Sequence, residues 1–177
     1  MLPISCQLPD EKNLTAETYD MVVGTVRQII DEVGQKCSFY TLEPMPWMYP
    51  HDIESQARLI RDVDRKAFAV HFDPVNLICS PSTYFSNASF IRDFVRQFGS
   101  LIKSVHAKDT LLGGRLTVHM DEVRPGLGVL DYPTLLSELE QVDHDMPLIV
   151  EHLKTDEEFT LGMEFIRKTA KTVNVEL

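Results

Sequence analysis

The chain has 177 residues, of which 44% are hydrophobic and 25% charged, a length and composition typical of one soluble globular domain. Its formal net charge of −10 repels phosphate backbones and therefore disfavours nucleic acid as a partner. The three cysteines are scattered, and no apolar run approaches the roughly 18 residues of a membrane span. We therefore expect no disulfide framework, no membrane insertion and a cytoplasmic location.

Strand patterns and helix patterns alternate along the whole chain. Short apolar runs predict buried parallel strands, and apolar residues at helical spacing predict amphipathic helices. Thr15 is a candidate N-cap of the first helix, and Gly34 follows its last periodic residue as a stop signal. The predicted strands cover residues 3–6, 39–42, 68–72, 102–105, 116–120 and 148–150, and the predicted helices cover residues 15–33, 53–63, 86–98, 132–139 and 157–171.

This alternation defines the fold class. Repeated strand–helix units predict parallel strands joined by right-handed crossovers. A closed eight-stranded barrel takes about 250 residues, so the chain has room for about five βα units. We predict an α/β fold that is either part of a TIM-type (β/α) barrel or a small open sheet. No linker or shift in composition divides residues 1–177, so a single domain is expected.

Four of the predicted strands are followed closely by, or end on, a residue that can bind a metal ion. These residues are Glu43, Asp73, His106 and Glu151. Because the carboxyl ends of parallel strands meet at one end of a barrel, the four side chains can converge on one cation. Three carboxylates and one imidazole suit Mn²⁺ or Mg²⁺, whereas Zn²⁺ is less natural without sulfur. Taken singly, an acid at a strand end is more often a helix N-cap or a solvated loop residue, so the prediction depends on all four strands ending in this way.

The two glutamates also suggest a reaction. A bound cation that polarises a carbonyl acidifies the neighbouring carbon, and a carboxylate on each face can then move the proton. Glu43 and Glu151 are the candidates for this acid/base pair.

Several other residues are substrate-binding candidates, each with a structural alternative. Lys108 and Arg124 could hold a phosphate or a sugar oxygen, but Lys108 is also explained as a solvated loop charge and Arg124 as a partner of a turn. His71 could line the barrel interior or be a core histidine. Trp47 could form a stacking wall for a sugar ring or anchor a loop. Strand alternation predicts that His152 faces away from Glu151.

Five segments, in this order, resemble the sugar phosphate isomerase/epimerase family, whose fold is a xylose-isomerase-like TIM barrel. They are LEPMP from Leu42, VHFDPVN from Val70, VHAKD from Val105, RPGLGVLDY from Arg124 and IVEHL from Ile149. The segments cover nearly the whole chain but only the C-terminal five of the family's eight βα units.

The resemblance implies a divalent metal, Mn or Mg with Zn or Co as alternatives, held by Glu43, Asp73, His106 and Glu151. It also implies that Glu43 and Glu151 exchange a proton of a sugar or sugar phosphate. The family often has a histidine three residues after the aspartate, and Asn76 stands there in this chain. An amide can bind a sugar hydroxyl but cannot act as a base, so a different substrate is expected.

Two other functions stay open, and so does self-association. An endonuclease IV-type phosphodiesterase shares this barrel, although Asn76 and the negative net charge argue against its histidine-rich metal cluster. A non-catalytic or degenerate half-barrel subunit is the other alternative. A half-barrel exposes strand edges and an apolar inner face, so we expect a homodimer or another self-assembly.

Overall fold

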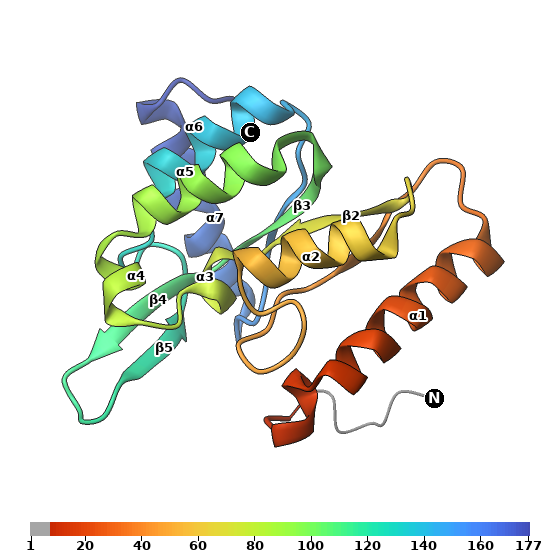
Figure 1. Ribbon diagram of the computed structural model, residues 1–177. Helices are drawn as coiled ribbons and strands as arrows, with labels where there is room; N and C mark the ends of the chain where they lie inside the picture. Colours follow the sequence, from red (N-terminus) through yellow and green to blue (C-terminus); the bar gives the residue numbers. More distant parts are fainter. Residues whose placement is uncertain (1–7) are drawn as a thin grey trace. The chain divides into compact units, whose positions relative to one another are not determined.

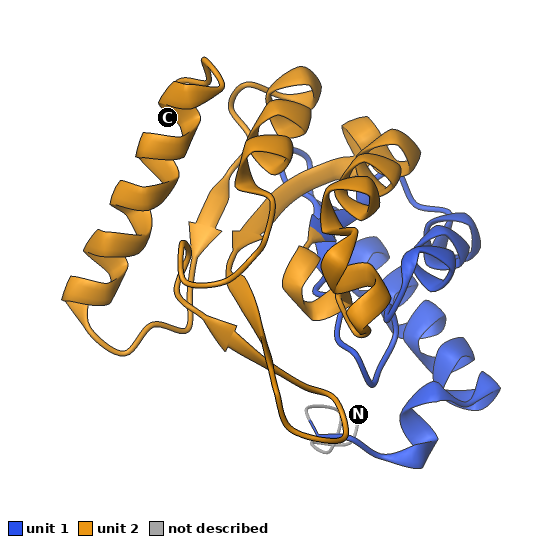
Figure 2. Cartoon of the chain, turned by 90° about the vertical axis from the view of Figure 1, so that its left-hand side faces the viewer, with its two compact units in different colours: residues 1–71 blue, residues 72–177 orange. Residues whose placement is uncertain are grey.

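The computed structural model describes residues 8–177 (Figure 1). The chain forms two compact units, the first ending at His71 and the second running from Phe72 to Leu177 (Figure 2). The strand predicted at residues 3–6 lies outside the described residues. None of the helices between residues 8 and 177 is long and apolar enough to cross a membrane.

The described elements confirm the predicted alternation. The strands are β1 Tyr40–Leu42, β2 Phe68–Phe72, β3 Ile102–Ala107, β4 Asp109–Gly113, β5 His119–Val123 and β6 Leu148–Val150. The α-helices are α1 Ala16–Val33, α2 Ile53–Val63, α3 Pro74–Leu77, α4 Pro81–Phe85, α5 Asn87–Phe98, α6 Tyr132–Val142 and α7 Asp156–Thr172, with 3₁₀ turns at η2 Glu11–Leu14 and η3 Gly99–Leu101. The fold is α/β, with a four-stranded sheet in the order β1-β2-β3-β6 and a two-stranded sheet of β4 and β5.

Side-chain caps fix the ends of the two long helices in the first unit. The Thr15 hydroxyl accepts a hydrogen bond from the Thr18 N–H at 3.2 Å, and Gly34 ends α1 with a φ of 56°, which glycine adopts without a steric penalty. Asp52 and Ser55 form a capping box at the start of α2. The predicted helices at residues 15–33 and 53–63 are therefore confirmed.

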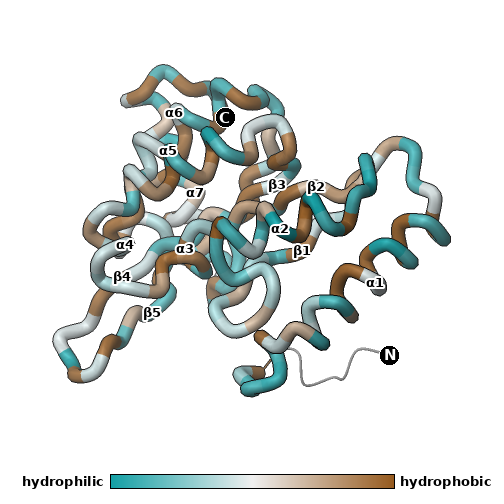
Figure 3. The backbone as a smooth tube through the Cα atoms, in the orientation of Figure 1, coloured by the Kyte–Doolittle hydropathy of each residue, from teal (hydrophilic) through white to brown (hydrophobic). Residues whose placement is uncertain are grey.

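The first unit has its own hydrophobic core. Helix α1 packs against α2, and Figure 3 shows hydrophobic and hydrophilic segments alternating along α1, as in an amphipathic helix. Strands β1 and β2 pair in parallel, with Tyr40 opposite Phe68. This pairing places Glu43, the residue after β1, at the carboxyl end of the strand pair. The buried core residues are Tyr19, Val22, Val23, Val26, Ile30, Leu59, Val63 and Phe68.

The second unit is organised around β3 and β6, which pair in parallel with His106 opposite Ile149. Side chains two residues apart on a strand share a face, so this register points His106, Ile149 and the following Glu151 to the same side. Helix α5 packs against α6, and α6 packs against α7 (Figure 1). The rings of Phe72 and Phe94, both in this unit, stack at 4.0 Å between centroids.

The segment after β3 departs from the sequence prediction. The strand predicted at residues 116–120 is wrong except for its last two residues, because β4 and β5 form an antiparallel hairpin that pairs Gly113 with His119. Leu116, whose hydrophobicity suggested a strand, lies in the turn and is 96% exposed. The pairing of the two strands decides this segment, and neither strand has the clean apolar–polar alternation that identifies a hairpin in a sequence.

Candidate metal centre

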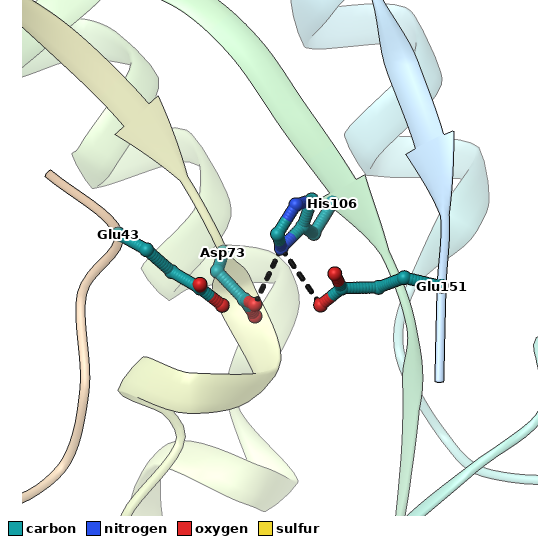
Figure 4. A group of neighbouring side chains, drawn as sticks. All are labelled: Glu43, Asp73, His106 and Glu151. Carbon is teal, nitrogen blue, oxygen red and sulfur yellow. Dashed lines mark hydrogen bonds and ion pairs between the residues drawn. The ribbon is translucent and has the colours of Figure 1, made fainter. Parts of the chain in front are cut away.

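Three of the four predicted metal ligands meet in the second unit. Asp73 follows β2, His106 lies near the end of β3 and Glu151 follows β6. The Nδ1 atom of His106 lies 3.2 Å from Asp73 Oδ2 and 2.9 Å from Glu151 Oε1; Figure 4 shows both contacts. The Asp73 carboxylate is buried at 0% exposure, so it needs a compensating partner.

The two carboxylate oxygens of Asp73 have different partners. Its Oδ1 accepts a hydrogen bond from the Asn76 N–H at 3.0 Å, as the N-cap of α3. Its Oδ2 points to His106. The N-cap alternative and the metal-ligand prediction for Asp73 are therefore compatible, and the cap fixes the orientation of the carboxylate.

The side chain of Lys108 lies in the middle of this cluster. Its Nζ is 2.8 Å from Asp73 Oδ2 and 2.6 Å from Glu151 Oε1, the same two oxygens that His106 contacts. The Lys108 side chain is only 1% exposed, so its explanation as a solvated loop charge is wrong. Its role in substrate binding stays a prediction.

Burial and neighbouring charges shift the pKa values of Asp73 and Lys108 in opposite directions. Burial raises the pKa of Asp73, but the hydrogen bond with His106 and the charge of Lys108 lower it more, so the net pKa lies below the ordinary value. Burial lowers the pKa of Lys108, but the Asp73 and Glu151 carboxylates raise it more, so the net pKa is raised. Asp73 is therefore an anion and Lys108 a cation near neutral pH.

The distances from His106 Nδ1 to the two carboxylates are compatible with a divalent cation bound among these candidate ligands. Adjacent ligands of an octahedral site with bonds of about 2.1 Å lie about 3.0 Å apart, close to the observed 2.9 and 3.2 Å. Nδ1 of an imidazole carries at most one proton and can donate to only one of the two carboxylate oxygens. A cation between the three atoms satisfies all of them. The Lys108 ammonium at the same oxygens shows that the cluster accommodates a positive charge.

Two further side chains of the second unit extend the cluster: Glu122, which the sequence analysis missed, and His152, to which it gave no role in the site. Glu122 Oε2, on β5, lies 3.5 Å from Lys108 Nζ. His152 Nδ1 lies 3.1 Å from Glu122 Oε1 and 3.6 Å from Glu151 Oε1. The prediction that His152 faces away from Glu151 is wrong, because β6 ends at Val150 and His152 has a φ of 58°, outside the strand conformation. No local pattern marks Glu122, which the hairpin brings to Lys108.

The other predicted site residues have these places. Glu43 follows β1 in the first unit. In the same unit, Trp47 is half-buried in the loop before α2 and His71 is buried in β2. In the second unit, Asn76 is on α3 and the Arg124 guanidinium donates to the Pro125 carbonyl at 3.3 Å, as the turn-partner explanation predicts. The metal roles of all four predicted ligands and the substrate roles of the other four residues stay predictions.

Asp109 is a buried structural residue that the sequence analysis did not single out. Its Oδ1 accepts hydrogen bonds from the N–H groups of Thr110 and Leu130, each at 2.9 Å. Its Oδ2 accepts from Gly126 at 2.9 Å and from Gly128 at 3.0 Å. One carboxylate thus organises the loop from Gly126 to Leu130. A Cβ on Gly128 would overlap the Thr110 carbonyl and the Asp109 side chain.

Removing the Asp73 charge is expected to have a pH-dependent effect on stability. Because the folded pKa of Asp73 is lowered, its ionised form stabilises the fold above the ordinary pKa of about 3.9, and this contribution is lost as the pH falls through the folded pKa. Relative to the wild type, the metal-free Asp73→Asn variant should therefore show its largest loss of stability near neutral pH, about pH 7, and the loss should shrink below about pH 4. Urea unfolding at several pH values measures this, with exposed Asp121→Asn as the control. A loss that does not change with pH would contradict it.

The chain matches one family of known proteins over most of its length. Residues 6–169 match the family model of the xylose isomerase-like TIM barrel. This chain belongs to that family. The resemblance seen in the sequence is thereby confirmed, and the fold class with it.

Three solved structures have a similar fold. A xylose isomerase-like TIM barrel protein from Mycobacterium smegmatis in complex with magnesium has a TM-score of 0.71 at 16% identity, with 94% of this chain and 53% of that chain covered. The 3-keto-D-glucoside 4-epimerase from E. coli has a TM-score of 0.62 at 17% identity, with 92% and 59% covered. A D-tagatose 3-epimerase-like protein has a TM-score of 0.67 at 20% identity, with 94% and 60% covered.

The chain spans between 53% and 60% of the length of these three structures. A search of curated proteins gave no significant match.

Proposed function

We propose that this xylose isomerase-like chain is a divalent-metal-dependent isomerase or epimerase that acts on a sugar or sugar phosphate. The observation that carries the proposal is that His106 Nδ1 lies 3.2 Å from Asp73 Oδ2 and 2.9 Å from Glu151 Oε1. Carboxylate and imidazole ligands of this kind suit Mn²⁺ or Mg²⁺, with Zn²⁺ or Co²⁺ as alternatives. The magnesium complex and the two epimerase-type structures support the proposal.

In this proposal the metal is held by Glu43, Asp73, His106 and Glu151, which offer three carboxylate oxygens and one imidazole nitrogen. When bound, the cation polarises a substrate carbonyl and acidifies the carbon beside it. Glu151, which is 21% exposed, can reach substrate and takes that proton, and Glu43 serves the opposite face. Proton removal on one face and return on the other inverts the carbon, which is an epimerisation.

Lys108 supplies a positive charge near the reacting atoms in this proposal. Its raised pKa keeps it charged, so it can stabilise the oxygen that becomes negative as the proton leaves. Asn76, Arg124, His71 and Trp47 are the proposed contacts to sugar hydroxyls, to a phosphate and to the ring. A homodimer in a cytoplasmic location also belongs to the proposal.

Proton exchange in deuterated water tests the function directly. The metal-free protein is loaded with Mn²⁺ or Mg²⁺ and incubated with a panel of ketoses and ketose phosphates, and NMR follows deuterium at the carbon next to the carbonyl. We expect metal-dependent exchange with at least one sugar and none after chelation. The exposed α7 variant Glu164→Gln should exchange at the wild-type rate. Stoichiometric metal binding without exchange on any sugar would favour the non-catalytic subunit instead.

A further inference from the structure

Lys108 and the proposed metal use the same two carboxylate oxygens. The ammonium lies 2.8 Å from Asp73 Oδ2 and 2.6 Å from Glu151 Oε1, and His106 Nδ1 faces both of these oxygens. A divalent ion bound by the three ligands would lie about 2.1 Å from the same oxygens. The ammonium and the metal would then be close neighbours of like charge, which is unfavourable in a buried site.

A third carboxylate, that of Glu122, lies near the Lys108 ammonium. Glu122 Oε2 is 3.5 Å from Lys108 Nζ, close enough to attract the charge but longer than a hydrogen bond. Both oxygens of Glu122 lie near His152 Nδ1, at 3.1 and 3.3 Å, so the carboxylate is held in place. The Glu122 side chain is 32% exposed, whereas that of Lys108 is 1% exposed, so Glu122 is the more solvent-accessible partner.

The backbone of Lys108 is fixed, so only its side chain has to move. The buried Tyr132 hydroxyl donates a hydrogen bond to the Lys108 carbonyl at 2.7 Å. The neighbouring Asp109 carboxylate holds Gly126, Gly128 and Leu130 through their N–H groups. A rotation about the flexible lysine side chain is enough to carry the ammonium toward Glu122.

We propose that Lys108 is the internal counter-ion of this site, which leaves Asp73 and Glu151 when a divalent metal binds and pairs with Glu122. This inference rests on the proposed metal site. Metal affinity is then set by competition: Lys108 opposes binding by stabilising the empty site, and Glu122 favours binding by receiving the displaced ammonium. Glu122 is a positioning residue in this scheme, because it acts through Lys108.

Calorimetric titration of the metal-free protein with Mn²⁺ tests the competition. Lys108→Gln should bind Mn²⁺ at least about tenfold more tightly, because the competing charge is gone. Glu122→Gln should bind about threefold or more weakly, because the ammonium loses its second partner. Lys168→Gln, which removes an exposed lysine on α7, should bind like the wild type.

A double variant separates this mechanism from a simple change in local charge. If Glu122 acts through Lys108, Glu122→Gln should have no effect on affinity in the Lys108→Gln background. An undiminished effect there would overturn the positioning role of Glu122. Equal or weaker Mn²⁺ binding by Lys108→Gln would overturn the counter-ion role while leaving the metal site intact. A wild-type protein that binds no Mn²⁺ would overturn both this inference and the proposed function.

Thermal unfolding gives a second readout that does not depend on activity. Lys108→Gln leaves Asp73 and Glu151 without their ammonium, so the metal-free variant should melt at a lower temperature than the wild type. Added Mn²⁺ should raise its melting temperature by more than it raises that of the wild type. If Lys108→Gln does not fold without metal, the comparison of Glu122→Gln with the wild type decides, and unchanged Mn²⁺ affinity in that variant would overturn the proposal.

Discussion

Replacement of Glu151 by glutamine is expected to slow proton exchange next to the substrate carbonyl by about a thousandfold or more. General bases typically contribute about 10²–10⁴-fold to a rate. Glutamine has the size of glutamate and keeps an oxygen for the cation, but it cannot accept a proton. The fold should be retained, because Glu151 follows β6 and is partly exposed. The measurement is deuterium incorporation in the NMR assay, at metal concentrations that saturate the variant.

Saturation with metal separates the two roles assigned to Glu151. Loss of a metal ligand weakens affinity and is overcome by added metal, whereas loss of the base persists when the site is full. The exposed Glu164→Gln variant on α7 should keep full activity. Exchange at the wild-type rate in metal-saturated Glu151→Gln would remove Glu151 from the catalytic role.

Replacement of Asp109 by asparagine is expected to lower the free energy of unfolding by about 3–5 kcal/mol, at the upper end of single-substitution effects. The Asp109 carboxylate accepts four backbone N–H groups and is 1% exposed. Each Asp109 oxygen accepts two backbone N–H groups. Asparagine keeps only one acceptor oxygen, so its NH₂ group would face the two N–H donors that the other oxygen had accepted. Buried donors left unsatisfied cost about 1–3 kcal/mol each.

Urea unfolding of the metal-free protein measures this loss. The matched control is Asp121→Asn on β5, which makes the same change at an exposed position of the same hairpin and should stay within about 0.5 kcal/mol of the wild type. A similarly small change in Asp109→Asn would show that the loop from Gly126 to Leu130 does not depend on the carboxylate. Lys108 precedes Asp109, so this variant should also weaken metal binding if the loop positions the site.

Local signals were enough for most of the helices and strands. Helix α2 begins and ends at the residues predicted, because Asp52 caps its first turn and its apolar face has helical spacing. Strands β2 and β6 were predicted at their observed bounds because continuous apolar runs mark buried parallel strands. The short helices α3 and α4 were missed, since four or five residues are too few to show a period.

The candidate ligands could be predicted because strand ends in this fold class share one location. The rule that parallel strands place their carboxyl ends together selected Asp73, His106 and Glu151 before any contact was known, and the second unit brings them together. Their role as metal ligands is part of the proposed function.

The sequence by itself determined the α/β class, the positions of the longer helices and the candidate residues near the strand ends, because each depends on neighbours within a few positions. Only the tertiary structure decided that Lys108 is buried between two acids, that Glu122 lies beside it and that Asp109 holds a distant loop. These facts depend on charges and N–H groups from separate segments that meet only when the chain has folded. Charge–charge contacts between distant segments leave no periodic pattern in the sequence, so they could not be predicted from local sequence.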